Sequence, residues 1–287
     1  MDPLGGVEMQ VDPCVIASDR QGCRDSGVLL TREREENLIR SKIAAFMVAS
    51  VFSVGIAWAD SAVPVAVAAA ISDPGRPAAD VARDAARKPA EMVMLAGLKP
   101  GDSVLEILPG SGYFTRIFSK VVGPSGHLYA GVPDPKSADA EPAAGTINAE
   151  PGYGNIIVVT IGSDAMKALP PLDVIWTSQN YHDLHLSRVH ADMLALDKQW
   201  FGLLKPGGVV VIVDHAALPG SPATETADKL HRIDPAIART EMEAAGFKFD
   251  GESDVLRNPA DPHTALVFDP SIRGKTDQFA FRFRKPM

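Results

Sequence analysis

A short stretch near the middle of the chain carries residue types that are typical of a cofactor loop. Residues 104–115 read VLEILPGSGYFT, in which Glu106 lies at the end of an apolar run and Gly110 and Gly112 form a Gly-x-Gly turn before a helix-like segment. Glycine lets the backbone turn tightly and approach a ligand without a Cβ in the way. The helix that follows would aim its free N–H groups at an anionic group. The stretch therefore predicts a cofactor site of the nucleotide type.

The spacing disfavours a dinucleotide as that cofactor. A dinucleotide fingerprint needs a third glycine three residues after the second, and an acid about twenty residues further on. Thr115 occupies the third glycine position, and the next predicted strand ends in Ala130, Gly131 and Val132 without an acid. We therefore do not expect an NAD-dependent oxidoreductase.

The same residues resemble the first motif of class I S-adenosylmethionine-dependent methyltransferases, an acid followed by a G-x-G-x-G loop. Glu106 holds the acid position, and Leu108 stands where the first glycine is expected. By resemblance, Glu106 orients the loop and the amino group of the methionine part. The cofactor-binding loop would consist of Pro109, Gly110, Ser111 and Gly112.

Later segments extend this resemblance from about residue 78 to the C-terminus. Asp164 falls where the family places an Asp that receives the adenine amino group, and residues 203–208 and 243–247 resemble the turns into the fifth and sixth strands. The family's ribose-binding acid is missing near Val132, and the nearest acid is Asp134. Either Asp134 reaches back to the ribose, or ribose binding is weakened. S-adenosyl-L-methionine is the cofactor that the resemblance implies.

A closer resemblance is to a group of exported bacterial proteins described as predicted methyltransferases. The shared stretches are residues 83–89, 180–184, 231–235 and 273–278. This resemblance implies no particular substrate.

The segment NYHDLH at residues 180–185 follows the fourth predicted strand, where such enzymes place groups near the transferred methyl. Methyl transfer is an in-line displacement in which the enzyme aligns the nucleophile, and a base helps if the nucleophile carries a proton. We predict His182 as that base and Tyr181 as a wall of the methyl pocket, and Asn180 would hold cofactor or substrate. Asp183 and His185 fit either function or a loop whose polar groups cap the next helix.

Further polar residues near the expected strand ends are candidates for substrate contact. His215 could line the substrate pocket or be a satisfied structural histidine. Arg273 and Lys275, with Arg257, could form a lid that selects an anionic substrate, although a mobile loop with scattered charges explains them equally well. Arg83 and Arg87 with the adjacent Lys88 could meet a carboxylate or form a solvated basic face.

Three other polar residues, His231, Arg232 and Asp234, precede the predicted helix at residues 236–245. Asp234 before a proline has the pattern of a helix N-cap, while His231 and Arg232 remain open. The histidines and acids at the strand ends could also gather around a metal, but no H-E-x-x-H or comparable spacing appears, so no metal is expected.

Alternating apolar strands and helices predict an α/β fold. The strands are apolar throughout rather than alternating, which indicates a doubly wound, mostly parallel seven-stranded sheet of Rossmann-like methyltransferase type with helices on both faces. The last two strands are joined without a full helix, so they should pair antiparallel at the sheet edge. The expected strands are residues 103–108, 126–132, 155–161, 173–177, 209–214, 247–254 and 279–283, and the main helices are residues 78–98 (split at Pro89), 113–122, 186–204 and 236–245.

The composition and the N-terminal segment bound the organisation of the chain. Its 287 residues carry a formal net charge of −8 and only 6% aromatic residues, which argues against a nucleic-acid partner. Residues 1–59 are expected to be a disposable extension with a secretory signal at about 37–59, cleaved near Ala59, so that the protein is periplasmic and not membrane-bound after cleavage. Residues 60–77 would be a flexible leader, and residues 78–287 the methyltransferase-like domain. Both cysteines lie in the removed segment, and the oligomeric state is open.

The function expected from these observations is S-adenosylmethionine-dependent methyl transfer to an unidentified small molecule. The alternative is a non-catalytic periplasmic ligand-binding protein on a methyltransferase scaffold. Leu108 and the missing ribose acid favour the binding protein, whereas Glu106, Asp164 and His182 favour the enzyme.

Overall fold

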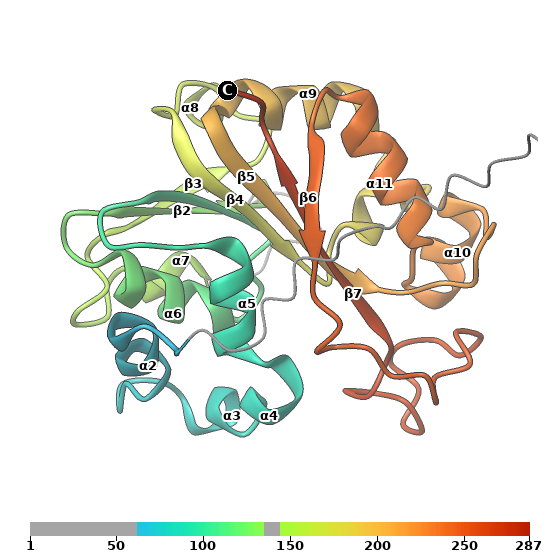
Figure 1. Cartoon of the computed structure of the whole chain (residues 1–287), viewed down its shortest axis with the longest axis horizontal. Helices are drawn as coiled ribbons and strands as arrows, with labels where there is room; N and C mark the ends of the chain where they lie inside the picture. The colour runs from blue at the N-terminus through green and yellow to red at the C-terminus, as the bar shows by residue number, and fades with distance from the viewer. Residues whose placement is uncertain (1–61, 135–143) are drawn as a thin grey trace, which may run out of the picture. The chain divides into compact units, whose positions relative to one another are not determined.

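A seven-stranded sheet forms the centre of the computed structural model, which describes residues 62–134 and 144–287 (Figure 1). All of these residues belong to one compact unit. The strand order is β3-β2-β1-β4-β5-β7-β6. The strands are β1 (Ser103–Ile107), β2 (His127–Val132), β3 (Ile156–Thr160), β4 (Leu172–Ser178), β5 (Leu204–His215), β6 (Lys248–Glu252) and β7 (Gln278–Arg284). The predicted doubly wound α/β fold is confirmed.

Strands β1 to β5 run parallel, and β7 runs antiparallel to both of its neighbours. The expected antiparallel pairing of the last two strands is therefore confirmed, with β6 outermost and β7 between β5 and β6. Because β6 and β5 point the same way, the long connection between β6 and β7 lies at the carboxyl ends of the strands. The loop that follows β1 lies at the same end.

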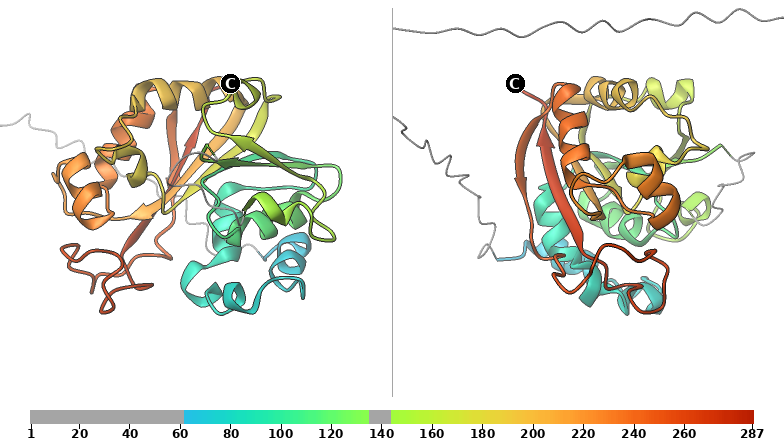
Figure 2. Two further views of the ribbon diagram at one scale, coloured as in Figure 1. Left: turned by 180° about the vertical axis from the view of Figure 1, so that it is seen from behind. Right: turned by 90° about the vertical axis from the view of Figure 1, so that its right-hand side faces the viewer.

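Helices cover both faces of the sheet. Apolar side chains of α2, α5, α6 and α7 pack with one face, and those of α8, α9 and α11 pack with the other. Figure 2 shows the two groups on opposite sides of the strands. The helices are α2 (Val65–Ile71), α3 (Ala78–Val81), α4 (Asp84–Arg87), α5 (Pro89–Ala96), α6 (Tyr113–Val122), α7 (Ala144–Ile147), α8 (Asp164–Lys167), the 3-10 helix η1 (His182–His185), α9 (Met193–Leu203), α10 (Ala223–Leu230) and α11 (Pro235–Ala244).

Two helices differ from the sequence expectation. The segment expected to be a flexible leader contains α2, whose Val67 and Ala70 are buried in the core that it shares with α5 and α6. The helix expected from residue 186 begins at Met193, because the Asp192 side chain caps it by accepting from the Ala195 amide at 3.0 Å. The residues between η1 and Asp192 form turns instead.

The expected extension and signal segment, residues 1–59, lies outside the described residues, and so do both cysteines. Within the described residues, no helix has the length and apolar character needed to cross a bilayer.

Candidate cofactor and acceptor site

The loop after β1 has the tight backbone that its glycines predict. Gly110 and Gly112 have φ values of 57° and 84°, and Leu108, at the first glycine position, also has a positive φ of 54°. Two hydrogen bonds hold Leu108 in this conformation: its amide donates to the Gly131 carbonyl at 2.9 Å, and its carbonyl accepts from Asn180 Nδ2 at 2.8 Å. The leucine therefore adopts the left-handed backbone for which glycine is normally required.

Glu106 is a buried acid near the carboxyl end of β1, with only 3% of its surface exposed. Burial raises the pKa of its carboxyl group to about 8, although the Thr115 hydroxyl, which donates to it at 2.7 Å, and the charge of Arg87 both lower the pKa. A buried carboxyl group in this position is suited to a cationic ligand, because a nearby positive charge would stabilise its ionised form.

Helix α6 begins directly at this loop, with Gly112 as its N-cap and without a side-chain cap. Its first amides are therefore not satisfied by a capping side chain and face the loop that the sequence assigned to the cofactor. A Cβ on Gly112 would lie 2.0 Å from Ile147 Cδ1, so α7 packs against the loop too closely for a side chain. The buried acid, the left-handed glycines and the uncapped helix together fit the methionine part of S-adenosylmethionine. Pro109 and Ser111 complete the turn: the Pro109 carbonyl accepts from the Gly112 amide, and the Ser111 carbonyl accepts from the Arg116 guanidinium.

The other two acids assigned to the cofactor lie at the ends of the neighbouring strands. Asp134 is exposed, two residues beyond the end of β2. Asp164 begins α8 after β3, its side chain is fully exposed, and it pairs with Lys167 at 3.2 Å. Both lie on the carboxyl-end side of the sheet, where a ribose and an adenine would follow the methionine part.

The side chains of Asn180 and Tyr181 are hydrogen-bonded within the protein, and they position other parts of the structure. Asn180 Nδ2 donates to the carbonyls of Leu108 and Ser178, both at 2.8 Å, and so ties the end of β4 to the cofactor loop. Tyr181 is fully buried, and its hydroxyl lies 2.8 Å from Glu241 and 3.2 Å from Asp197. The prediction that Tyr181 walls the methyl pocket is therefore corrected: its ring packs beneath α9 and α11, where an apolar ring gains most from burial.

His185 joins the same internal network and not the strand-end cluster. Its Nε2 lies 3.0 Å from Glu241 Oε1, and its Nδ1 lies 3.1 Å from the Tyr181 carbonyl. Burial opposes protonation of His185, but the Glu241 carboxylate raises its pKa. Of the two roles that the sequence left open for His185, functional and structural, these contacts agree with the structural one.

His182 is buried beside Asp214, at the carboxyl ends of β4 and β5. Its Nδ1 lies 2.7 Å from Asp214 Oδ1, and its backbone amide donates to Asp214 Oδ2 at 2.7 Å. Burial lowers the pKa of His182, but the carboxylates of Asp214 and Asp183 raise it to about 10. An imidazole with that pKa is protonated at neutral pH, so the structure does not present His182 as the free base that the sequence suggested.

The other histidines of this region surround His182. His231 Nδ1 lies 3.3 Å from His182 Nε2, and the His215 ring lies 5.9 Å from the His182 ring. Burial lowers the pKa of His215 to about 4, and its Nδ1 lies 2.8 Å from Thr276 Oγ1. His215 therefore faces the strand ends as a neutral imidazole, near the place where an acceptor was predicted.

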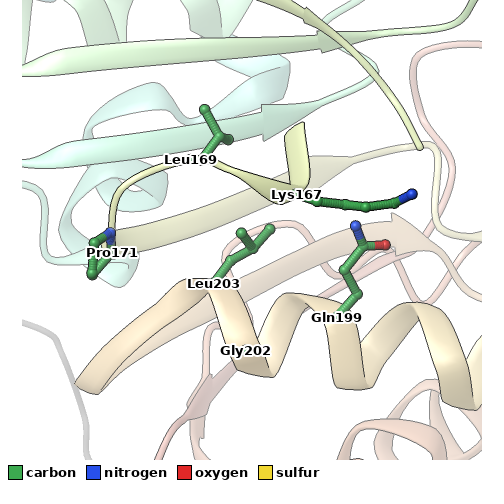
Figure 3. Close-up of a pocket in the computed structure, with 6 residues that line it drawn as sticks. All are labelled: Lys167, Leu169, Pro171, Gln199, Gly202 and Leu203. Carbon is green, nitrogen blue, oxygen red and sulfur yellow. The ribbon is translucent and has the colours of Figure 1, made fainter. Parts of the chain in front are cut away.

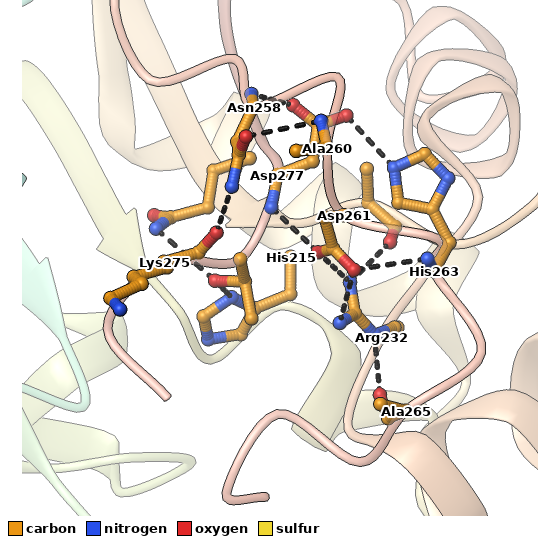
Figure 4. Close-up of polar contacts among 12 residues, drawn as sticks. His215, Arg232, Asn258, Ala260, Asp261, His263, Ala265, Lys275 and Asp277 are labelled. Atoms are coloured by element: carbon orange, nitrogen blue, oxygen red, sulfur yellow. Dashed lines mark hydrogen bonds and ion pairs between the residues drawn. The ribbon is translucent and has the colours of Figure 1, made fainter. Parts of the chain in front are cut away.

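The connection between β6 and β7 is held by buried carboxylates rather than being a mobile lid. Asp261 pairs with Arg232 at 2.8 Å, and Asp277 pairs with His263 at 3.0 Å (Figure 4). Asp277 also pairs with Arg257 at 2.9 Å. Arg257, whose side chain is 45% exposed, is therefore committed to an ion pair within the connection. Arg273 and Lys275 are exposed on this connection, two residues apart, and Thr276 next to them contacts His215.

A pocket of about 320 Å³ lies at the amino end of β4, the opposite end of the sheet from the β6–β7 connection (Figure 3). It is lined by Lys167, Leu169, Pro171, Gln199, Gly202 and Leu203, and Pro171 directly precedes β4. Its position at the amino end of β4 separates it from Glu106 and His182, which lie toward the carboxyl ends.

Two residues at the site carried a signal that the sequence analysis did not use fully. Asp214 is completely buried after the apolar run VVVIV, and an acid at the end of a buried strand is itself a sign of a paired charge. Arg87 lies against the rings of Tyr113 and Phe114, with its carbon Cζ 4.6 and 5.0 Å from their centroids, and donates to Ser178 and Gln179. Burial lowers the pKa of Arg87 to about 10, which leaves it charged at neutral pH.

The strand order, the antiparallel β7 and the acid-and-glycine loop after β1 define a class I S-adenosylmethionine-dependent methyltransferase, with S-adenosyl-L-methionine as its cofactor. The family model for protein-L-isoaspartate(D-aspartate) O-methyltransferase matches residues 24–215, and the chain belongs to this family. The match begins upstream of the described residues, inside the segment that we expected to be removed.

Curated relatives and a solved structure agree with this family at different levels. The chain is 40% identical over 82 residues to a protein-L-isoaspartate O-methyltransferase of Ignicoccus hospitalis, covering 29% of this chain and 36% of that protein. It is 30% identical over 158 residues to the enzyme of the same name from Aeropyrum pernix, covering 55% and 51%. The matches thus span about a third and about half of the lengths of these relatives. A SAM-dependent methyltransferase of Aquifex aeolicus shares the fold, with a TM-score of 0.51 at 20% identity over 71% of this chain and 93% of that one.

Proposed function

We propose that the protein transfers the methyl group of S-adenosylmethionine to a carboxylate oxygen of an isoaspartyl residue in a protein or peptide. The observation that carries this proposal is the family match over residues 24–215. The small-molecule acceptor expected from the sequence is a less specific alternative, and the comparisons lend no support to a non-catalytic periplasmic binding protein.

Carboxylate chemistry is consistent with the residues at the strand ends. A carboxyl group with a pKa of about 4 is already deprotonated at neutral pH, so methyl transfer to it requires alignment and no general base. When bound, S-adenosylmethionine supplies a methyl group on a positively charged sulfur. The acceptor oxygen would form the new C–O bond while the C–S bond breaks, and the electron pair of the C–S bond would remain on sulfur.

Arg87 is our candidate for binding a carboxylate of the acceptor or of the cofactor. It is held by neutral partners, Ser178 and Gln179, and no carboxylate among the described residues forms an ion pair with it. A half-buried guanidinium without an ionic partner gains from a bidentate carboxylate, because the charge is then neutralised away from bulk water.

The remaining roles at the site follow from the positions of the residues. We assign Glu106 and the loop from Pro109 to Gly112 to the methionine part, Asp134 to the ribose and Asp164 to the adenine. Asn180 acts as a positioning residue for the loop. His215, Arg273 and Lys275 lie on the acceptor side, at or beside the connection between β6 and β7.

A matched pair of peptides tests the acceptor. Two synthetic peptides of one sequence, containing either isoaspartate or aspartate, are incubated with the protein and methyl-labelled S-adenosylmethionine, and label transfer is measured. We expect base-labile label in the isoaspartyl peptide alone. If protein that binds S-adenosylmethionine in a calorimeter labels neither peptide, the isoaspartyl acceptor is contradicted. A small-molecule acceptor would then be the better explanation.

Arg83 and Arg87, the N-cap and the last residue of α4, provide a variant test of the same proposal. Arg87→Gln should raise KM for the isoaspartyl peptide, or Kd for the cofactor, by roughly tenfold or more, the usual effect of losing hydrogen bonds to a charged group. Arg83→Gln is the matched control, because the Arg83 side chain is 45% exposed on the same segment. Equal effects of the two substitutions would remove the specific role of Arg87.

We also propose that the protein is exported to the periplasm after cleavage near Ala59. The support is the basic segment, the apolar run and the Ala-Trp-Ala sequence at residues 37–59. N-terminal mass spectrometry of the protein isolated from a periplasmic fraction should give a first residue of Asp60. Recovery of the protein in the cytosol with residues 37–59 intact would contradict export.

A further inference from the structure

Three potential ligand atoms converge at the carboxyl ends of β4 and β5. They are His182 Nε2, Asp183 Oδ1 and His231 Nδ1. His182 Nε2 lies 3.2 Å from Asp183 Oδ1 and 3.3 Å from His231 Nδ1, and the third side of the triangle, from His231 Nδ1 to Asp183 Oδ1, is 3.3 Å. The three atoms therefore form a nearly equilateral triangle.

These separations lie at or beyond the upper end of the range for hydrogen bonds from nitrogen, and they suit a shared ion. Hydrogen bonds from nitrogen have a typical length of roughly 2.9 Å. Ligands roughly 2.1 Å from one metal ion lie roughly 3.0–3.4 Å from each other in octahedral or tetrahedral geometry. All three sides of this triangle fall in that range, so one ion could lie at ligand distance from all three atoms.

Asp214 fixes His182 in the orientation that a metal ligand needs. Its carboxylate is fully buried and accepts from the backbone amides of His182 and His215, both at 2.7 Å, and from His182 Nδ1 at 2.7 Å. Because the carboxylate is an acceptor, Nδ1 keeps its proton, and Nε2, which faces the triangle, is the nitrogen that would give up its proton to an ion. A carboxylate behind a histidine is the usual second shell of a protein metal site, where it fixes the ring and its tautomer.

His231 is presented to the triangle by a strained backbone. It caps the C-terminus of α10 with a φ of 51°, a left-handed conformation that is uncommon for residues other than glycine. The Phe268 ring packs on its imidazole with 4.9 Å between centroids. Strained residues of this kind are concentrated at functional sites. The side chains of Asp183 and His231 are 30% and 27% exposed, which leaves a path for an ion from solvent.

We propose that His182, Asp183 and His231 form a binding site for a divalent transition-metal ion such as Zn²⁺. Two imidazoles with one carboxylate match the ligand preferences of Zn²⁺, Fe²⁺, Co²⁺ and Ni²⁺, whereas Mg²⁺ and Ca²⁺ prefer oxygen ligands. Three protein ligands leave at least one coordination position for water or an oxygen of a bound molecule. The prediction that no metal is bound would then be wrong. It was made because His182 and Asp183 are adjacent and His231 follows 49 positions after His182, which matches no recognisable metal motif.

At this position the ion would act in methyl transfer. That role rests on the proposed function, whereas metal binding itself does not. The ion would bind one oxygen of the acceptor carboxylate and orient the other oxygen toward the methyl group. In that case His182 is a ligand and not a base.

Metal titration of the full chain tests the site directly. Protein freed of metal by a chelator is titrated with Zn²⁺ in competition with a chromophoric chelator, and with Co²⁺ while its visible spectrum is recorded. We expect one ion per chain and the absorption of a nitrogen- and oxygen-ligated Co²⁺. His231→Ala and Asp183→Ala should each weaken Zn²⁺ binding by on the order of a hundredfold, and Asp214→Asn by about tenfold or more.

His190→Ala is the matched control for these variants. His190 is exposed and has a φ of 52°, almost the same left-handed backbone as His231, so the two substitutions have similar local consequences for the fold. The control should retain wild-type Zn²⁺ affinity. Asp183→Ala, at a partly exposed side chain, provides a second variant if His231→Ala does not fold.

The proposal is overturned if the wild-type chain binds less than half an equivalent of Zn²⁺ and Co²⁺, or if His231→Ala and Asp183→Ala bind as tightly as His190→Ala. Calorimetry with S-adenosylmethionine on the same samples separates this result from the proposed function. A chain that binds Zn²⁺ but not S-adenosylmethionine would contradict the methyltransferase activity alone. A chain that binds S-adenosylmethionine but not Zn²⁺ would contradict the metal site alone.

Discussion

Leu108 places a branched side chain in left-handed backbone at the centre of the cofactor loop. Left-handed backbone is unfavourable for a residue with a Cβ by about 1 kcal/mol or more, whereas glycine adopts it freely. Leu108→Gly should therefore relieve strain and lose only the packing of a half-buried side chain. Leu108→Ala loses the same packing and keeps the strain.

We expect the alanine variant to have a lower free energy of unfolding than the glycine variant by about 1 kcal/mol, in urea titrations of the two proteins. S-adenosylmethionine affinity of the glycine variant, measured by calorimetry, should be at least that of the wild type. An alanine variant as stable as the glycine variant would show that the loop carries no strain at Leu108.

Glu106 gives the stability of the protein a distinct pH dependence. Its folded-state pKa of about 8 lies above its ordinary value of 4.5, because burial disfavours the charged form more than Thr115 and Arg87 favour it. Between these two values the folded state binds a proton that the unfolded state has lost. The contribution of Glu106 therefore lowers the free energy of unfolding as pH rises through this window, by at most about 1.4 kcal/mol per pH unit.

Glu106→Gln removes this contribution and keeps an oxygen that can accept from the Thr115 hydroxyl. Urea unfolding of both proteins at pH 5 and pH 9 should show a smaller loss of stability for the variant. Other titrating groups, including Asp197 with its pKa raised to about 7, are common to both proteins and cancel in the comparison. Parallel profiles would contradict the buried, protonated carboxyl group.

The candidate site could be predicted from sequence only where backbone constraints determine it. Glu106, Gly110 and Gly112 follow from a strand, a turn and a helix in succession, and the structure has them there. The direction of a side chain after a strand end depends on packing that sequence does not display. Tyr181 and His182 are neighbours, yet one ring turns beneath α11 and the other toward Asp214.

At the scale of elements, the junction between α6 and α7 depends on the absence of a side chain at Gly112. An added Cβ would lie 2.0 Å from Ile147 Cδ1, and Ile147 is fully buried, so it has little room to move. Gly112→Ala should lower the free energy of unfolding by about 2–3 kcal/mol, from left-handed backbone plus overpacking. It should also weaken S-adenosylmethionine binding, because the start of α6 shifts.

Gly123 at the other end of α6 supplies the control. It has a φ of 66° with open space around it, so Gly123→Ala should cost only about 1 kcal/mol and leave cofactor affinity unchanged. Thermal melts and calorimetry on the two variants make the comparison. Equal effects would mean that the contact with Ile147 is unimportant.

Sequence patterns predicted the elements unevenly, and the physical reasons differ. All seven strands were expected, because mostly apolar runs bounded by glycine and proline leave few alternatives. The fifth strand begins at Leu204, five residues before its expected start. Helix α2, VAVAAAI, was missed because a short Ala- and Val-rich segment after a proline has no periodic polar face. Its helical state comes from packing of Val67 and Ala70 on α5 and α6, which is a tertiary effect.

At the scale of the whole molecule, one buried ion pair joins distant segments. Arg232 and Asp261 both have completely buried side chains and lie 2.8 Å apart, and Arg232 also donates to the carbonyls of Ala216 and Ala265. Asp261→Ala would leave the guanidinium charge buried without its partner, and should lower the free energy of unfolding by about 3–5 kcal/mol. Glu225→Ala, which breaks the exposed pair with Lys229, should change it little.

Denaturant unfolding of the two variants checks this difference. If Asp261→Ala is as stable as Glu225→Ala, the pair does not anchor the connection between β6 and β7. Proteolysis within residues 253–277 should become faster in the Asp261 variant, because the connection then opens more often.

The position of β7 between β5 and β6 has a consequence for how the chain reaches its native state. During synthesis β6 emerges before β7, and β7 is its hydrogen-bonding partner in the sheet. Until residues 278–284 leave the ribosome, β6 has no place to dock, and β5 presents an open edge over residues 209–215. The nascent protein thus passes through a stage with an unprotected strand edge, at which pairing with another chain competes with completion of the sheet.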